Sequence, residues 1–287
     1  MPAGLHHPAL ESAAATGIGT ASAAGWSPAF VGERLADALA RGLRVHAIAG
    51  LQGTGKSTLA MQLVAAARGR GLGALALSID DFYLGRRDRQ RLGRTVHPLC
   101  ATRGPPGTHD VALACDVLDA LAAGQPARLP RFDKIADRRL PPSRWPLARG
   151  TDLVVFEGWF LKVPPQPSAA LRAPVNALER NEDPDGTWRR WANDALAHDY
   201  AALWTRLPRM LFLQPPGFEV VPEWRWQQEL TLQAAHPGRR AMDHAQVMRF
   251  VQFFERTSCN ALATLPAIAD EVVRVDAARR VVPRSAD

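Results

Sequence analysis

Lysine is scarce in this sequence, since Lys56, Lys134 and Lys162 are the only three among 35 basic residues. Arginine therefore supplies nearly all of the positive charge behind the net charge of +7 at pH 7. The arginines are spread along the chain, with no long basic run and no repeat of basic and aromatic residues, so a nucleic-acid partner is not expected. We interpret them as anion-binding groups and solvated surface.

Cysteine and long apolar segments are also few. The three cysteines, Cys100, Cys115 and Cys259, show no metal-binding spacing and no Cys-x-x-Cys pair, which predicts a reducing compartment. No apolar run is long enough to span a bilayer, and the N-terminus has no basic segment followed by an apolar core. We therefore expect a cytoplasmic protein with no membrane partner.

The 287 residues, 47% hydrophobic and 22% charged, are typical of a globular protein with one large core. Residues 1–25 are rich in Ala, Gly and Ser without a sustained period, so we expect a disordered N-terminal tail. The remainder, residues 26–287, is expected to form a single domain.

A glycine-rich stretch at residues 49–58, AGLQGTGKST, fits the phosphate-binding P-loop: Gly, four free positions, then Gly-Lys-Ser. Glycines let backbone N–H groups turn inward toward phosphate oxygens. Lys56 would reach the β- and γ-phosphates of ATP, and the Ser57 hydroxyl would bind Mg²⁺. The competing interpretation is a chance glycine-rich turn. The expected nucleotide-binding residues are Gly50, Leu51, Gln52, Gly53, Thr54, Gly55, Lys56, Ser57 and Thr58.

The pattern around this stretch predicts an α/β fold. Short apolar runs predict strands at 43–49, 74–79, 152–156, 209–213 and 271–276, and helical periodicity marks 28–41, 57–67, 111–122, 223–233 and 245–256. A strand, the P-loop and a helix whose N-terminus faces the anion follow in the order that this motif requires. We therefore predict a P-loop NTPase fold, with a five-stranded parallel sheet flanked by helices.

Carboxylates follow two of the predicted strands. Asp80 and Asp81 come after 74–79, and Glu157 comes after 152–156. Ligands of open α/β sheets lie at the carboxyl ends of the strands, so a general base or a metal-linked carboxylate is expected there. A helix cap or a turn is the alternative for the Asp pair. We expect Ser57, Asp80 and Glu157 to hold Mg²⁺, directly or through water.

Residues 86–149 are rich in proline and arginine, and we expect loops around one helix, inserted for substrate binding. A solvated linker is the alternative, although interleaved charged and apolar residues suit a rigid pocket better. Arginine binds carboxylates through two hydrogen bonds, so the cations here favour an anionic, hydroxylated acceptor over a neutral nucleoside. Residues 162–200 are a second possible insertion that walls the site. The expected substrate residues in the first insertion are Arg103, His109, Arg131, Asp133, Lys134, Asp137 and Arg138.

Together these motifs resemble the P-loop kinases of small molecules that include uridine kinase, phosphoribulokinase and bacterial pantothenate kinase. The finer pattern resembles the D-glycerate 3-kinase family of plant and fungal type. The resemblance covers roughly residues 40–280. It rests on Gly50–Thr58, Ser78–Leu84, Thr102–Asp110, Pro130–Arg138, Phe156–Trp159, Pro174–Glu179, Trp224–Glu229 and Arg249–Arg256.

The resemblance implies ATP-dependent phosphorylation of a small hydroxylated molecule, D-glycerate first. Asp80 and Tyr83 match the family's Asp-x-Phe-Tyr corner, which makes Asp80 the expected base and Tyr83 a substrate residue. Arg225, in a lid at about 217–245, is expected to stabilise charge on the transferred phosphoryl group. The sequence departs from the pattern at residues 221–225, which carry Pro and Glu at the entry to that helix.

Two other functions compete with this interpretation. One is a P-loop ATP-binding regulator or ATPase that has no small-molecule acceptor, and the other is a kinase of the nucleoside or pantothenate type. The polar cluster at 97–138 argues against the regulator, because a regulator needs no enclosed cationic pocket between its second and third strands.

Overall fold

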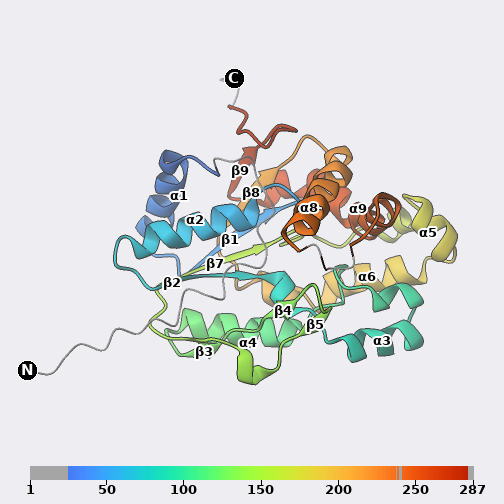
Figure 1. Ribbon diagram of the computed structural model, residues 1–287, viewed down its shortest axis with the longest axis horizontal. Coiled ribbons are helices and arrows are strands. Elements are labelled where there is room, and N and C mark those ends of the chain that lie inside the picture. Colours follow the sequence, from blue (N-terminus) through green and yellow to red (C-terminus); the bar gives the residue numbers. More distant parts are fainter. Residues whose placement is uncertain (1–24, 237, 239–240, 284–287) are drawn as a thin grey trace, which may run out of the picture.

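A five-stranded parallel sheet forms the centre of the computed structural model, which describes residues 25–236, 238 and 241–283 (Figure 1). The sheet has the order β2-β7-β1-β8-β9. The predicted strands are confirmed, each within two residues of the expected bounds. The tail expected over residues 1–25 lies outside the described residues except for Gly25. The strands are β1 (Val45–Gly50), β2 (Ala74–Ser78), β7 (Leu153–Gly158), β8 (Met210–Gln214) and β9 (Glu271–Arg274).

Strand β1 lies between β7 and β8, and all six of its residues are buried. Because neighbouring strands are parallel, their carboxyl ends meet at one edge of the sheet. Ser78 at the end of β2 lies beside Glu157 on β7, and Ala49 on β1 lies beside Gly158. The P-loop and the predicted carboxylates therefore emerge at the same edge.

Helices cover both faces of the sheet (Figure 1). On one face α1 (Pro28–Ala40) and α2 (Lys56–Arg68) pack in a core that includes Ile48 of β1. On the other, α4 (Val111–Ala122) and α9 (His244–Ile268) share a core with Ala47 and Ala49. Side chains alternate along a strand, so β1 contributes to both cores and holds the P-loop on a rigid base.

None of the described helices is long and apolar enough to cross a membrane. Helix α9 runs twelve residues beyond its predicted end at 256, because Leu265 and other apolar residues continue its buried face. The remaining helices are α3 (Arg86–Thr95), α5 (Ala177–Glu182), α6 (Thr187–His198), α7 (Ala201–Trp204) and α8 (Val221–Ala235).

Residues 86–149 are more regular than the predicted loops. They begin with helix α3 and contain two short antiparallel pairs. The sequence of α3, RRDRQRLGRT, has no apolar stripe, so its periodicity gave no helical signal. The helix is anchored by Arg89, which is 2% exposed and donates to the carbonyl oxygens of Leu84 and Ala101. The short strands are β3 (Ala127–Arg128) with β6 (Leu147–Ala148), and β4 (Phe132–Asp133) with β5 (Arg138–Arg139).

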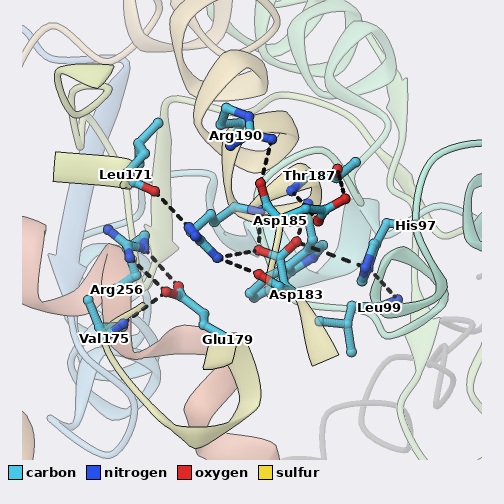
Figure 2. Close-up of polar contacts among 12 residues, drawn as sticks. His97, Leu99, Leu171, Val175, Glu179, Asp183, Asp185, Thr187, Arg190 and Arg256 are labelled. Carbon is cyan, nitrogen blue, oxygen red and sulfur yellow. Dashed lines mark hydrogen bonds and ion pairs between the residues drawn. The ribbon is translucent and has the colours of Figure 1, made fainter. Parts of the chain in front are cut away.

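Buried ion pairs join α5, α6 and α9 (Figure 2). Arg256 binds both carboxylate oxygens of Glu179, at 2.7 and 2.6 Å, and Arg189 Nη1 lies 3.0 Å from an Asp183 oxygen. Glu179, Asp183 and Arg189 are each 3% exposed or less. Removing one partner of such a pair typically costs about 3–5 kcal/mol. Helices α5 and α6, which belong to the segment 162–200 that was expected to wall the site, therefore contribute to the framework of the fold.

Candidate active site

The P-loop connects β1 to α2 at residues 51–55 and has the backbone that its glycines permit. Gly53 and Gly55 have φ angles of +85° and +89°, a left-handed conformation that other residues adopt at a cost. A Cβ atom on Gly53 would lie 2.7 Å from the Cβ of Trp224 on α8, which leaves no room for a side chain. Glycine is therefore required here for both conformation and packing.

Lys56 begins helix α2 and is 8% exposed. Its Nζ donates to the carbonyl oxygen of Leu51 at 2.9 Å, so the ammonium is folded back over the loop. Burial lowers the pKa of Lys56, whereas the nearby carboxylates of Glu157 and Asp80 oppose that shift. The ammonium thus lies close to the P-loop and to both carboxylates. A bound triphosphate would place its negative charge next to this ammonium.

Ser57 and Glu157 lie together although they are 100 residues apart. The Ser57 hydroxyl donates to Glu157 Oε1 at 2.9 Å. A hydroxyl and a carboxylate beside a triphosphate are the oxygen donors that Mg²⁺ prefers, with water and phosphate completing its shell. The residues therefore suit Mg²⁺.

The two adjacent aspartates have different environments. Asp80 accepts from the Tyr83 hydroxyl at 2.7 Å and from Lys134 Nζ at 2.7 Å. Burial alone would raise the pKa of Asp80, but Lys134 and Tyr83 outweigh burial and lower it from 3.8 to about 2. Asp81 instead forms a capping box with Ser78 and pairs with Arg131 at 3.1 Å. Asp80 therefore faces the site, and Asp81 has the helix-cap role that was the alternative for this pair.

Lys134 lies in the turn between β4 and β5. Asp133 shapes this turn by accepting from two backbone N–H groups that follow it. Arg103 donates to the carbonyl oxygen of Lys134 at 3.1 Å and pairs with Asp137 at 2.6 Å, and Arg89 also pairs with Asp137 at 2.8 Å. These ion pairs hold the turn so that the ammonium of Lys134 reaches Asp80.

A chain of aromatic side chains, Tyr83, His109 and Tyr200, packs next to Asp80. The ring of His109 lies 4.7 Å from that of Tyr83, and its Nδ1 is 2.6 Å from the Tyr200 hydroxyl. That hydroxyl also accepts from the backbone N–H of Gly107. Burial lowers the pKa of His109 to about 3 despite the charge of Asp80. Burial therefore keeps the ring of His109 neutral at pH 7.

A cavity opens in front of the P-loop. It joins several of the predicted residues, because Lys56, Ser57, Asp80, Lys134 and Glu157 all line it. Its other lining residues are Gln52, Gly53, Gly55, Thr58, Trp159, Gln227, Gln228 and Arg279. None of these residues comes from 162–200.

Other predicted residues lie outside this cavity lining. Arg131 pairs with Asp81, and Arg138 is exposed on β5. Arg225 on α8 donates to Glu229 at 3.2 Å, and its guanidinium lies 5.7 Å from the centre of the Phe250 ring. In the described structure these three guanidinium groups do not line the P-loop cavity.

Comparison with known proteins shows where the chain belongs. No family model matches it. The chain is 32% identical over 219 residues to the uncharacterized kinase mug58 of Schizosaccharomyces pombe, which spans 72% of this chain and 76% of that protein. It is 29% identical over 213 residues to the chloroplastic D-glycerate 3-kinase of Arabidopsis thaliana, spanning 70% of this chain but only 43% of the plant protein.

The solved structure of D-glycerate 3-kinase from Cryptococcus neoformans has a TM-score of 0.74 with this fold. It is 25% identical, and the match covers 90% of this chain and 99% of that one. This chain belongs to the D-glycerate 3-kinase family of P-loop kinases. The kinase class implied by the motifs is thus confirmed. The protein is an ATP-dependent phosphotransferase that acts on an alcohol group, and the alternative of a P-loop ATP-binding regulator is set aside.

Four residues of the kinase cavity were not among the sequence-predicted site residues. Trp159 lies two residues after Glu157, just beyond the end of β7. Its position beside the cavity could therefore have been inferred from the end of that strand. Gln227 and Gln228 lie about one helical turn after Trp224, the residue that contacts Gly53. Arg279 comes from the turn after β9, and nothing in the local sequence indicates that it reaches the P-loop.

Proposed function

We propose that this kinase transfers the γ-phosphoryl group of ATP to a hydroxyl of D-glycerate. The observation that carries the proposal is the ammonium of Lys134, 2.7 Å from Asp80 in the cavity in front of the P-loop. An acceptor with a hydroxyl near a carboxylate would place the hydroxyl on Asp80 and the carboxylate on Lys134. The names of the plant and fungal relatives support the same acceptor.

The residues of the cavity would divide the chemistry as follows. Lys56 would neutralise charge on the β- and γ-phosphates. Ser57, Glu157 and Asp80 supply the oxygen atoms that would hold Mg²⁺, which when bound offsets charge on the same phosphates. Asp80 would accept the proton of the attacking hydroxyl, and the exchange of its Lys134 contact for the acceptor would restore part of its basicity.

Residues outside the cavity lining would act on those inside it. Arg103, Asp133 and Asp137 would hold the β4–β5 turn that carries Lys134, while Tyr83 and His109 would orient Asp80 and the acceptor. Arg131 would hold Asp81, with Arg138 at the outer edge of the hairpin. Arg225 would stabilise the transferred phosphoryl group after leaving its contact with Glu229, in a lid formed by residues of about 217–245. The substrate insertion of about 86–149 and this lid would belong to one kinase domain.

The experiment measures ADP formation by the purified protein with ATP and Mg²⁺. The acceptors are D-glycerate, glycerol, uridine and pantothenate. Glycerol shares the hydroxyls of glycerate but has no carboxylate, so we expect turnover with D-glycerate and little with glycerol. Ready phosphorylation of uridine or pantothenate, with none of D-glycerate, would refute the acceptor and leave only the kinase class.

A substitution tests the role given to the ammonium. Lys134→Met is expected to raise the KM for D-glycerate about 10-fold or more, since a charge-assisted hydrogen bond is lost, and to leave the KM for ATP nearly unchanged. Arg138→Gln is the matched control, because Arg138 lies in the same hairpin but outside the cavity lining. Equal effects of the two substitutions would show that Lys134 does not contact the acceptor.

A further inference from the structure

Arg279 has an unusual backbone for an arginine. It lies in the tight turn after β9, where its N–H donates to the carbonyl oxygen of Asp276 and where Arg280 N donates to Asp276 Oδ1. Its φ angle is +63°, in the left-handed region that glycine and asparagine occupy most easily. A strained position that keeps a bulky residue indicates that the side chain has a role.

The side chain of Arg279 reaches the P-loop, 226 positions earlier in the sequence. Its Nε donates to the carbonyl oxygen of Gly53 at 2.8 Å, and its Nη2 donates to Gln227 Oε1 at 3.1 Å. The guanidinium lies 4.8 Å from the centre of the Trp224 ring, while Trp224 Nε1 donates back to Ala277 O in the same turn. One side chain thus joins the P-loop, helix α8 and the turn after β9.

These contacts bear on phosphate binding. A P-loop binds phosphate by directing N–H groups toward it, and a carbonyl turned into the loop would repel the anion. The guanidinium holds the Gly53 carbonyl, and the Trp224 side chain packs on the same glycine. Arg279 also lines the cavity beside Lys56 and Ser57, so its charge is available to the nucleotide.

We propose that Arg279 is a positioning residue of the nucleotide site, which fixes the Gly53 peptide of the P-loop and ties it to helix α8. The inference rests on ATP binding at this cavity, which the proposed function shares, but it does not depend on the identity of the acceptor. A role confined to stability would require the same contacts, so the test has to separate nucleotide binding from folding.

The test is Arg279→Asn, since asparagine tolerates a positive φ and removes the guanidinium. Relief of the strained φ angle offsets part of the stability lost with the two hydrogen bonds, so we expect the melting temperature to fall by only about 2–4 °C. The Kd for ATP with Mg²⁺, measured by calorimetry, and the KM for ATP are expected to rise about 10-fold, the effect of losing one charged hydrogen bond. The KM for the acceptor should be unchanged.

Two further variants complete the test. Arg279→Lys keeps the positive charge but cannot bind Gly53 and Gln227 while lying over Trp224, so most of the loss in ATP affinity should persist. Arg280→Asn is the matched control, because the neighbouring Arg280 side chain is 79% exposed and pairs with Asp276. It should bind ATP as the wild type does.

The outcomes distinguish this inference from the proposed acceptor. If Arg279→Asn binds ATP with wild-type affinity, whatever its melting temperature, the positioning role of Arg279 is overturned and the proposed acceptor is unaffected. If the wild type binds ATP but ignores D-glycerate, while Arg279→Asn binds ATP weakly, the acceptor is wrong and the role of Arg279 stands.

Discussion

The burial of His46 predicts that the folded kinase loses stability as the pH falls below neutrality. It lies in the middle of the sheet on β1, is 3% exposed, and neither ring nitrogen has a hydrogen-bond partner in the described structure. Burial, aided by the charge of Arg209, lowers its pKa from 6.5 to about 4, although Asp37 and Asp270 oppose the shift. Below pH 6.5 the unfolded chain therefore binds a proton at this position that the folded protein does not.

This difference makes the folded state less stable as the pH falls from 6.5 toward 4. Linkage between the two pKa values gives a loss in the free energy of unfolding of about 2 kcal/mol between pH 7 and pH 5. By pH 4 the loss from this one residue is about 3 kcal/mol. Such a loss is a large fraction of the stability of a typical protein.

His46→Leu removes the titrating group without removing any hydrogen bond to the ring. Urea unfolding at pH 7 and pH 5 should show that the variant loses about 2 kcal/mol less than the wild type between the two values. His109, also buried, is present in both proteins and cancels in this comparison. His198→Leu is the control, since His198 is exposed on α6 and its replacement should leave the wild-type dependence. An equal loss in His46→Leu and the wild type would refute the reasoning.

Two predictions concern the phosphate end of the cavity. Lys56→Ala should fold and lose about 10²- to 10³-fold in kcat, because a preorganised charge is removed from the transferred phosphoryl group; ADP release by a folded variant measures this, and near-normal turnover would contradict it. Glu157→Gln should raise the Mg²⁺ concentration required for half-maximal rate, since Glu157 and Ser57 share a hydrogen bond at the proposed metal position. A Mg²⁺ titration that matches the wild type would remove Glu157 from the metal site.

The sheet was accessible from the sequence because its strands are short apolar runs and its central motif has a fixed context. β1, the P-loop and α2 follow one another in the chain, so local patterns place them together. The strand order was not accessible in the same way, since β7 pairs with both β1 and β2 across more than 70 residues. Helix α3 was missed because a buried arginine, rather than an apolar stripe, anchors it.

Most of the cavity residues that could be predicted follow strands or belong to the P-loop motif, and Lys134 was predicted from the charged residues of 86–149. Lys56, Ser57, Asp80 and Glu157 follow strands or belong to that motif, and all four line the cavity. The position of Arg279 depends on a turn conformation and on a contact across 226 positions, neither of which leaves a pattern in the sequence. The partners of the arginines in 86–149 likewise depend on which of many nearby carboxylates each one meets.

The distribution of lysine gains a physical reason from the structure. Two of the three lysines, Lys56 and Lys134, line the cavity, whereas Arg89 and Arg103 hold the turn that presents Lys134. A guanidinium has a planar fork that suits several fixed oxygen atoms at once, and an ammonium is a compact charge on a flexible stem. Arg89 and Arg103 thus each contact more than one fixed oxygen atom, whereas Lys134 contacts one carboxylate oxygen, that of Asp80. Under the proposed function Lys134 would exchange its contact with Asp80 for the acceptor carboxylate, and we expect an arginine at this position to make that exchange less readily because its planar fork favours several fixed oxygen atoms.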